Sequence, residues 1–414
     1  MKKWIMALIA FIGGLGVGLL KDTMCSSQNI YSQLALFSEA LKLVKDNYVK
    51  EVEDKDIIYG AIKGMTLALD PYSSFLTPDM YKELEVETTG EFGGLGIEIT
   101  IKDSYLTIVA PIEDTPAYRA GLKSGDRILK INGEPTKDLT LMEAVKRLRG
   151  PKGTKVTLTI WREGVPKPFD VTITRDIIKI KSVKDADLGE GYVYIKIKSF
   201  QEDTSGELKR AIEKYYKRSP INGLILDLRN NPGGLLSEAI KVSDLFLKKG
   251  LIVYTKGRTA SSNMEFKADE DGYTDFPMIV LVNRGSASAS EIVASSLKDN
   301  KRAVLMGEKT YGKGSVQTIY RLSDSSGLRL TTALYYTPSN YQIQDNGLMP
   351  DIIFESQKTK EEPEEEEEEP VEEKMQKFDP ASDPMVRSAL GYLKSWNIWG
   401  KNLFMERNKE SSAK

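Results

Sequence analysis

The spacing of apolar residues changes twice along the chain and divides it into three parts. Between Tyr31 and Leu69, apolar residues recur at intervals of three and four, which predicts helices. Thr77 followed by Pro78 is typical of a helix start, because threonine caps the first turn and proline fits its first position. The first part is therefore expected to be helical.

From Gly90 to Thr174 the pattern changes to short segments that predict strands. The predicted strands cover residues 96–101, 106–110, 127–131, 156–161 and 169–174. A turn at Asn132-Gly133 and one helix around residues 141–148 complete the unit. We expect this segment to fold as a domain of its own.

From Asp176 onward, apolar strands alternate with helices. The predicted strands are 192–197, 223–228, 251–255, 278–282 and 303–307, and the predicted helices are 204–216, 235–247 and 288–297. Fully apolar strands indicate a sheet that is covered on both faces. The predicted fold class is therefore an α/β multidomain protein, with ligand sites at the carboxyl ends of the strands.

The N-terminus predicts export. Lys2 and Lys3 precede an apolar run from Trp4 to Leu20, which is slightly short for a membrane span and slightly long for a signal peptide. The run is thus either a cleaved signal or a membrane anchor. The single Cys25 excludes an intramolecular disulfide and does not decide the compartment.

Composition excludes several catalytic chemistries. The 414 residues contain no histidine and one cysteine. These counts exclude a Ser-His-Asp triad, a Cys-His pair, and zinc sites built on histidines or several cysteines. A hydrolase in this chain must therefore use a lysine or a carboxylate as its base.

The charges nearly balance, with 58 Lys and Arg against 60 Asp and Glu, but ten glutamates gather between Glu361 and Glu373. Self-repulsion within this run predicts a solvated acidic linker. No basic cluster interleaved with aromatic residues occurs in the sequence, so nucleic acid is not an expected partner.

Two loops at predicted strand ends carry residue types suited to chemistry. The loop from Asp227 to Gly234 ends in a glycine pair, which either lets backbone N–H groups approach a ligand or forms an ordinary turn. The loop from Gly285 to Glu291 contains three serines, and Ser288-x-x-Glu291 is also a capping box. Both interpretations place Ser288 at a helix N-terminus, where the next N–H group can face an oxyanion.

A third loop, from Gly307 to Gln317, nearly matches a phosphate-binding P-loop. Gly314 stands where that motif needs serine or threonine, and a strand is predicted to follow, so nucleotide binding is not expected. Lys313 lies between two glycines, where desolvation can make it a neutral base for a serine hydroxyl. Gln317 is placed to supply an amide acceptor for that lysine.

Together these three loops resemble the carboxyl-terminal processing (tail-specific) serine peptidases. The resemblance covers nearly all of residues 31–355, including the stretch from Asp70 to Pro78. It implies Ser288 as nucleophile, Lys313 as general base and Gln317 as the residue that orients the lysine. It further implies an oxyanion hole formed by the backbone amides of Ala289 and one of the loop glycines, with Gly233 as the first candidate, and it excludes Lys309 as the base.

The segment from Gly90 to Thr174 resembles a PDZ domain, which this family carries before its catalytic core. Gly94, Leu95, Gly96 and Ile97 match the loop that binds the terminal carboxylate of a peptide, and residues 120–133 match the region after it. The resemblance implies that substrates with free C-termini bind there, with the peptide added as a strand.

These observations predict six segments, which are a signal or anchor (1–30), a helical region (31–89), a PDZ domain (90–174), a peptidase core (175–355), an acidic linker (356–374) and a partly helical tail (375–414). The protein is expected at the periplasmic or extracytoplasmic face of the inner membrane, anchored by residues 4–20.

The leading hypothesis is a serine endopeptidase that cleaves unstructured C-terminal regions of proteins recognised or gated by the PDZ domain. The alternative is a PDZ scaffold with a catalytically weak, peptidase-like core. Ser295-x-x-Lys298 matches the SxxK motif of penicillin-recognising enzymes, but the companion motifs are missing. No cofactor or metal is expected, and a homo-oligomer or a regulatory partner is left open.

Overall fold

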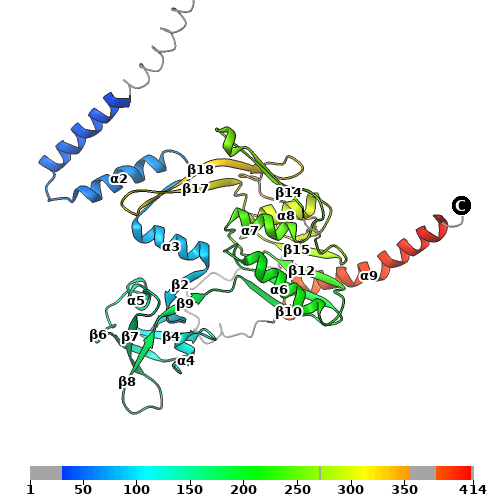
Figure 1. Cartoon of the computed structure of the whole chain (residues 1–414), viewed down its shortest axis with the longest axis horizontal. Coiled ribbons are helices and arrows are strands. Elements are labelled where there is room, and N and C mark those ends of the chain that lie inside the picture. The colour runs from blue at the N-terminus through cyan, green and yellow to red at the C-terminus, as the bar shows by residue number, and fades with distance from the viewer. Residues whose placement is uncertain (1–29, 270–271, 355–378, 412–414) are drawn as a thin grey trace, which may run out of the picture. The chain divides into compact units, whose positions relative to one another are not determined.

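The structure is a computed structural model that describes residues 30–269, 272–354 and 379–411 (Figure 1). The expected N-terminal anchor and the glutamate run lie outside the described residues. Contacts divide the chain into two compact units, one of Met1–Thr77 with Tyr320–Leu330 and one of Pro78–Ile319 with Thr331–Lys414.

The described N-terminal part of the first unit is mainly helical, as predicted. Residues 30–47 form a helix, α2 (Asp54–Leu67) follows, and β1 (Ser74–Leu76) pairs antiparallel with Gly327–Arg329. Tyr59 of α2 donates a hydrogen bond to Asp324 at 2.5 Å. The hydroxyl of Ser326 and then that of Tyr59 lower the pKa of Asp324 to about 2 by donating to its carboxylate. Between residues 30 and 411, no described helix is both long and apolar enough to span a bilayer.

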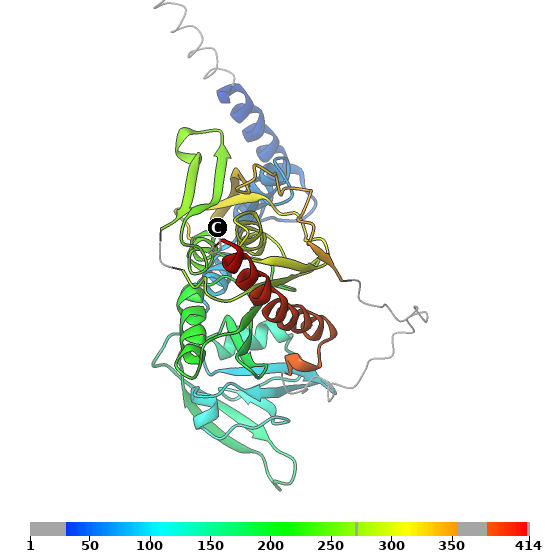
Figure 2. The same ribbon diagram turned by 90° about the vertical axis from the view of Figure 1, so that its right-hand side faces the viewer.

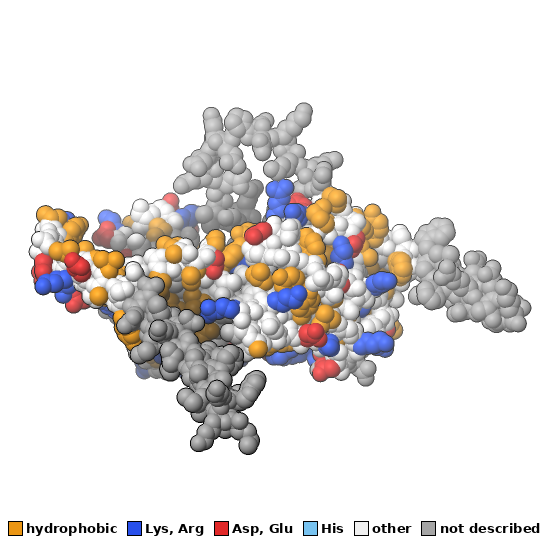
Figure 3. Space-filling model, turned by 90° about the horizontal axis from the view of Figure 1, so that it is seen from above, with side chains coloured by type: hydrophobic (Ala, Val, Ile, Leu, Met, Phe, Trp, Pro, Cys, Tyr) orange, Lys and Arg blue, Asp and Glu red, His pale blue; other side chains and the backbone are white. Residues whose placement is uncertain are grey.

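Many apolar side chains of the first unit are exposed, including Leu36, Phe37 and Leu43 of the first helix. Figure 3 shows hydrophobic side chains on the surface of the chain interspersed with charged ones.

The predicted PDZ region is a small antiparallel unit. Its strands are β2 (Glu91–Gly94), β3 (Ile97–Lys102), β4 (Tyr105–Pro111), β5 (Arg127–Ile131), β6 (Glu134–Pro135), β7 (Lys155–Trp161), β8 (Phe169–Thr174) and β9 (Asp176–Lys179). The main sheet has the order β3-β4-β5-β7-β8. Strand β2 pairs separately with β9, which begins two residues after the expected domain boundary at Thr174. Its core contains Ile108, Ile128 and Leu158, all with no exposed surface.

Three helices accompany these strands. They are α3 (Pro78–Thr89), which begins at the predicted proline, α4 (Pro116–Arg119) and α5 (Leu141–Leu148). Thr140 and Glu143 form a capping box at the start of α5, so that two backbone N–H groups are satisfied locally. Arg175 donates to the carbonyls of Arg147 and Leu148 and thereby caps the other end.

The peptidase region contains the predicted sheet. Its order is β10-β11-β12-β15-β16-β19, formed by β10 (Val183–Asp187), β11 (Tyr192–Ile197), β12 (Gly223–Asp227), β15 (Met278–Val282), β16 (Val304–Gly307) and β19 (Ile352–Ile353). Only β10 is antiparallel to its neighbour. The carboxyl ends of β12, β15 and β16 therefore meet at one edge, where all three reactive loops begin.

The predicted strand 251–255 is present, but it belongs to a second sheet. This corrects the expectation that all strands after Asp176 alternate with helices in one sheet. This strand, β13 (Gly250–Gly257), pairs with β14 (Met264–Ala268) and with β18 (Gly327–Tyr336), and β18 also pairs with β17 (Ser315–Arg321). An apolar run does not reveal which sheet it joins, because that depends on a partner about 80 residues away.

The parallel sheet is covered on both faces, as predicted. On one face lie α6 (Thr204–Tyr216), α7 (Leu236–Asp244) and α8 (Ala289–Asp299), which share the largest core with the strands. On the other face lies the start of α9 (Pro384–Ser411), seen in red in Figure 2. Met385, Val386, Ala389 and Leu393 of α9 pack against side chains from four of the strands.

Candidate active site

Ser288 is the only one of the three clustered serines with an exposed part. It stands immediately before α8 with φ +56° and ψ −116°, an unusual backbone conformation for a residue with a side chain. Ser286 and Ser290 are fully buried, and their hydroxyls donate to the carbonyls of Leu228 and Asn231 at 2.8 and 2.9 Å. The two flanking serines thus join the Ser288 loop to the loop after β12, and Ser288 is left facing the surface.

Glu291 links the Ser288 loop to the Lys313 loop. Its Oε2 atom accepts hydrogen bonds from the backbone N–H groups of Ser288 and Lys313, each at 2.9 Å. Its Oε1 atom accepts from Thr310 Oγ1 at 2.5 Å and from the N–H of Gly312 at 2.8 Å. One carboxylate oxygen therefore holds the backbone of the predicted nucleophile next to that of the predicted base.

The Glu291 carboxylate is buried without an ion-pair partner among the residues that the structure describes. Burial raises the pKa of Glu291 above its ordinary value, and its four hydrogen-bond donors oppose that rise. Sequence reasoning gave this glutamate only a capping role. The Ser288-x-x-Glu291 spacing was the signal, but it did not indicate that the same carboxylate also reaches the Lys313 loop.

The backbone of Lys313 is fixed by close contacts. Gly312 has φ +95°, and a Cβ atom on Gly314 would lie 2.4 Å from the backbone nitrogen of Gln344, so both glycines are required. The hydroxyl of Tyr335 donates to the Lys313 carbonyl, and the Tyr335 N–H donates to that of Gly314. Lys313 is half-buried, whereas Lys309 in the same loop is exposed.

Gln317 lies on β17 with a fixed side-chain amide. Its Nε2 atom donates to Thr331 Oγ1 at 2.8 Å and to Ser315 Oγ at 3.3 Å. Its Oε1 atom is buried and accepts no hydrogen bond from the described part of the chain. A buried carbonyl oxygen without a donor is costly, so this atom is a ready acceptor for a cation or an N–H group.

The structure brings Gly233 and Ala289 together beside Ser288. Gly233 has φ +103°, and a Cβ atom there would lie 2.7 Å from Ser288 Cβ and 3.0 Å from the Ala289 nitrogen. The Ala289 N–H donates to no residue in the described ranges, while the Gly233 N–H donates to Asn231 Oδ1 at 2.9 Å. An oxyanion would have to share or displace the bond from Gly233.

The predicted carboxylate-binding loop lies between β2 and β3. The Leu95 carbonyl accepts from Ala117, and the Gly96 carbonyl accepts from Ile112 and Thr115, which fixes the loop. Gly96 has φ +79°. The N–H groups of Leu95 and Gly96 donate to no described residue, so they are available to an anion.

A pocket of about 660 Å³ adjoins this loop. It lies between α3 and α5, beside Phe92 and Gly93, which directly precede the loop. Met80, Val86, Met142 and Val145 supply apolar walls, and Lys146 at the rim pairs with Asp79 at 2.9 Å. The pocket can therefore accept apolar side chains near the loop.

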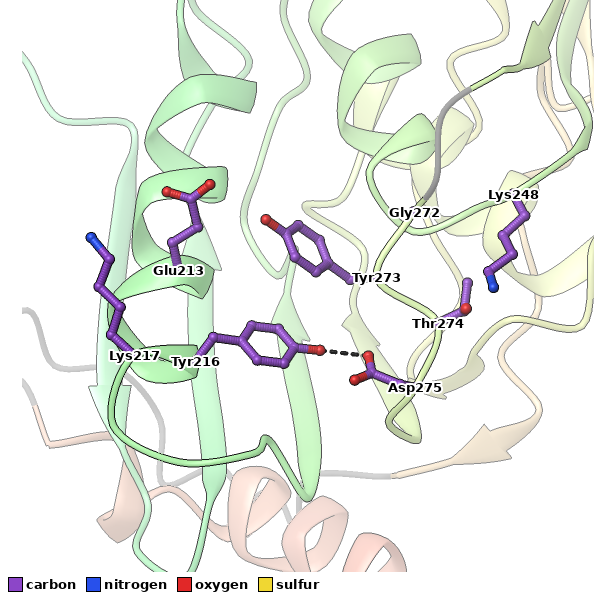
Figure 4. A pocket seen from close by; sticks show the side chains of 8 residues that line it. All are labelled: Glu213, Tyr216, Lys217, Lys248, Gly272, Tyr273, Thr274 and Asp275. Carbon is purple, nitrogen blue, oxygen red and sulfur yellow. Dashed lines mark hydrogen bonds between the residues drawn. The ribbon is translucent and has the colours of Figure 1, made fainter.

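A second pocket, of about 550 Å³, contains none of the predicted site residues (Figure 4). Tyr216 and Tyr273 stack there with ring centroids 5.5 Å apart, and Tyr216 donates to Asp275 at 2.5 Å. Burial and this carboxylate raise the pKa of Tyr216. Across the described residues, no group of three His, Cys, Asp or Glu side chains is placed to hold a metal ion.

Three family models match the sequence. Residues 191–354 match peptidase family S41, residues 107–162 match the PDZ domain, and residues 19–80 match the N-terminal domain of the activating protease CtpB. These ranges correspond to the three parts that the apolar pattern separates.

Similar proteins from bacteria align with most of the chain. A carboxy-terminal-processing protease of Bartonella bacilliformis is 47% identical over 364 residues, covering 85% of this chain and 83% of the relative. A carboxyl-terminal-processing protease of Synechocystis is 42% identical over 321 residues, covering 76% and 75%. A Bacteroides fragilis structure assigned to the S41 proteases shares the fold, with a TM-score of 0.51, 17% identity, and coverage of 84% of this chain and 91% of that one.

Proposed function

We propose a catalytic Ser288–Lys313 dyad supported by Gln317 for a chain that belongs to peptidase family S41, the carboxyl-terminal-processing proteases. That membership makes the protein a serine-type peptidase with a PDZ domain, and it is the premise of the proposal. The observation that carries the proposal is the Glu291 carboxylate, one oxygen of which binds the backbone N–H groups of both Ser288 and Lys313. Two residues held in this way can act on one peptide bond.

In the proposed reaction, neutral Lys313 removes the proton from Ser288 Oγ as this oxygen attacks the scissile carbonyl carbon. The N–H groups of Ala289 and Gly233 stabilise the resulting oxyanion. The lysine then gives its proton to the leaving amine, and an acyl-enzyme forms on Ser288. Water, activated by the same lysine, attacks the acyl carbon and releases the second product.

Gln317 supports this reaction through its Oε1 atom. The bonds from Nε2 to Thr331 and Ser315 fix the amide plane, and the buried oxygen is left as an acceptor. A hydrogen on the side-chain nitrogen of Lys313 is the donor that we assign to it. In the neutral lysine that bond would aim the nitrogen lone pair at Ser288 Oγ, and after proton transfer it would stabilise the ammonium form.

We further propose that the PDZ domain binds the free C-terminus of unstructured protein substrates. The unused N–H groups of Leu95 and Gly96 suit a carboxylate, and the adjoining apolar pocket suits the side chains that precede it. The sequence likewise supports export and anchoring by residues 4–20 at the extracytoplasmic face of the inner membrane. A membrane fraction that retains the full chain and releases a variant lacking residues 4–20 would test the anchor.

The test of the function uses the full chain and β-casein, an unfolded protein substrate. The wild type should release fragments whose ends, located by mass spectrometry, map cuts in the C-terminal region, and Ser288→Ala should release none. Ser286→Ala loses only the buried bond from its hydroxyl to the Leu228 carbonyl, so it should cleave more slowly but still cleave. Binding of casein without cleavage by the wild type would instead support the alternative of a PDZ scaffold with a weak peptidase core.

A further inference from the structure

Asp383 joins the C-terminal helix to the loop that follows β12. One of its oxygens, Oδ1, accepts from the N–H groups of Met385 and Val386 at 2.8 and 3.1 Å and so caps the start of α9. The other oxygen, Oδ2, pairs with Arg229 at 2.9 Å. A single carboxylate thus binds two segments that are separated by about 150 residues of sequence.

Arg229 lies between two carboxylates. Its guanidinium forms hydrogen bonds of 2.6 to 3.1 Å with Asp227, a fully buried residue that also accepts from Tyr194 at 2.6 Å. The Arg229 side chain is only 15% exposed. Asp227 faces Arg229 from the end of β12, and Asp383 faces it from the C-terminal segment, so the arginine is held from two sides.

The residues on either side of Arg229 hold the Ser288 loop. The Leu228 carbonyl accepts from Ser286 Oγ, and Asn230 exchanges two hydrogen bonds with Asn283, at 2.8 and 2.9 Å. A few residues further on, Gly233 packs against Ser288. A shift of Arg229 would therefore be passed to both loops that meet at the candidate active site.

The start of α9 is well anchored for such a role. Met385, Val386 and Ala389 pack into the core on the sheet face opposite α6 to α8, with at most 7% of each residue exposed. This packing places Asp383 near the carboxyl end of β12, where the loop that contains Arg229 begins. Surface ion pairs contribute little, but a partly buried arginine between two carboxylates fixes geometry through directed bonds.

We infer that Asp383 is a positioning residue for peptide-bond cleavage, which acts through Arg229 to hold the loop that carries Gly233. The inference rests on the proposed function of Ser288 and Lys313. It makes residues 379–393 part of the active-site scaffold instead of an accessory tail. Asp383 itself touches no reacting group, so its loss should change the catalytic step and leave substrate binding intact.

Three full-chain variants test the inference. Asp383→Asn keeps a helix-capping side chain but loses the charge that pairs with Arg229. Asp383→Glu keeps the charge. Asp379→Asn is the matched control, because Asp379 also caps a short helix in this segment, through the Ala381 N–H at 3.0 Å, and forms no ion pair with a described residue.

We expect Asp383→Asn to lower kcat for β-casein by about 10- to 100-fold with little change in KM, since small displacements of reacting groups have effects of this size. The melting temperature should stay within about 2 °C of the wild type. Asp383→Glu should recover part of kcat, and Asp379→Asn should leave kcat unchanged.

Equal kcat in Asp383→Asn and the wild type would overturn the inference. So would a fall in kcat that Asp379→Asn reproduces, or one accompanied by an equal loss of folded protein, because either would indicate a merely structural role. Ser288→Ala is measured alongside. Activity in that variant would contradict the proposed dyad itself, whereas an inactive Ser288→Ala beside a fully active Asp383→Asn would reject only the role of Asp383.

Discussion

Glu291 is the residue on which the candidate active site most depends. Motif reasoning singles out Ser288, Lys313 and Gln317, but the backbones of the first two are held together by this carboxylate. Thr310 donates to the same carboxylate and also accepts from the Leu348 N–H, so a second loop is tied to it. The backbones of the two residues proposed for catalysis are thereby fixed before any substrate binds.

Glu291→Gln should lower both stability and kcat. The amide is nearly isosteric, but its NH₂ group faces N–H donors, which leaves buried hydrogen bonds unmade at a cost of about 1–3 kcal/mol. Glu238→Gln is the matched control, since Glu238 is also buried and accepts from a backbone N–H, that of Ser205, but lies outside the site. Thermal unfolding and casein cleavage are measured for both, and an unchanged kcat in Glu291→Gln would contradict the positioning role.

Stability should also depend on pH through Glu291. Burial raises its pKa, so the folded state keeps this proton to higher pH than the unfolded state does. The stabilisation that this raised pKa gives to the folded state is fully present below the ordinary pKa of 4.5. It is lost as pH rises through the pKa that Glu291 has in the folded protein. The free energy of unfolding of the wild type relative to Glu291→Gln should therefore fall as pH is raised from about 4, as followed by urea denaturation.

At the scale of elements, the loop between β2 and β3 should select free C-termini. Charge-assisted bonds of its N–H groups to a carboxylate are worth about 1.5–3 kcal/mol, or roughly 10- to 150-fold in affinity. In full-length Ser288→Ala, which the proposed dyad predicts to be inactive, a peptide with a free C-terminus should bind more tightly than its amidated form by that factor. Equal affinities, measured by fluorescence anisotropy, would refute carboxylate recognition and leave the domain as a steric gate.

Gly96→Ala tests the same loop from the protein side. Gly96 has φ +79°, and a Cβ atom there would lie 2.3 Å from Thr115, so the loop must move. Gly121 has φ +76° but open space around it, so Gly121→Ala carries a similar backbone strain without the clash. Peptide affinity should fall in Gly96→Ala and persist in Gly121→Ala; a loss of equal size in both would show that strain alone is responsible.

Elements were predictable from sequence where local pattern decides them. The apolar strands 223–228 and 278–282 and the helix start at Pro78 were confirmed, because periodicity and capping act within a few residues. The sheet to which β13 belongs was not predictable, because it depends on pairing with Ala333–Tyr336. Ser288 was distinguished in the sequence by its place at a helix start and by the family resemblance, whereas the complete burial of Ser286 and Ser290 depends on packing and appears only in the structure.

At the scale of the whole chain, the family and the order of the domains could be recognised from motifs, whereas the role of the C-terminal segment could not. The sequence indicated only a partly helical tail after the glutamate run. That the first turns of α9 cover one face of the sheet, and that Asp383 meets Arg229, follows from long-range packing. For the same reason the sequence did not reveal that Glu291 also accepts a hydrogen bond from the N–H group of Lys313, 22 residues away.

The identity of the base can be decided by comparing two lysines in one loop. Lys313 is half-buried and bound through its backbone to Glu291, whereas Lys309 is exposed. Initial rates of casein cleavage at saturating substrate should fall by at least about 100-fold in Lys313→Ala, since a general base contributes 10²- to 10⁴-fold. The rate in Lys309→Ala should stay within about twofold of the wild type. An active Lys313→Ala beside an inactive Lys309→Ala would contradict the proposed Ser288–Lys313 dyad.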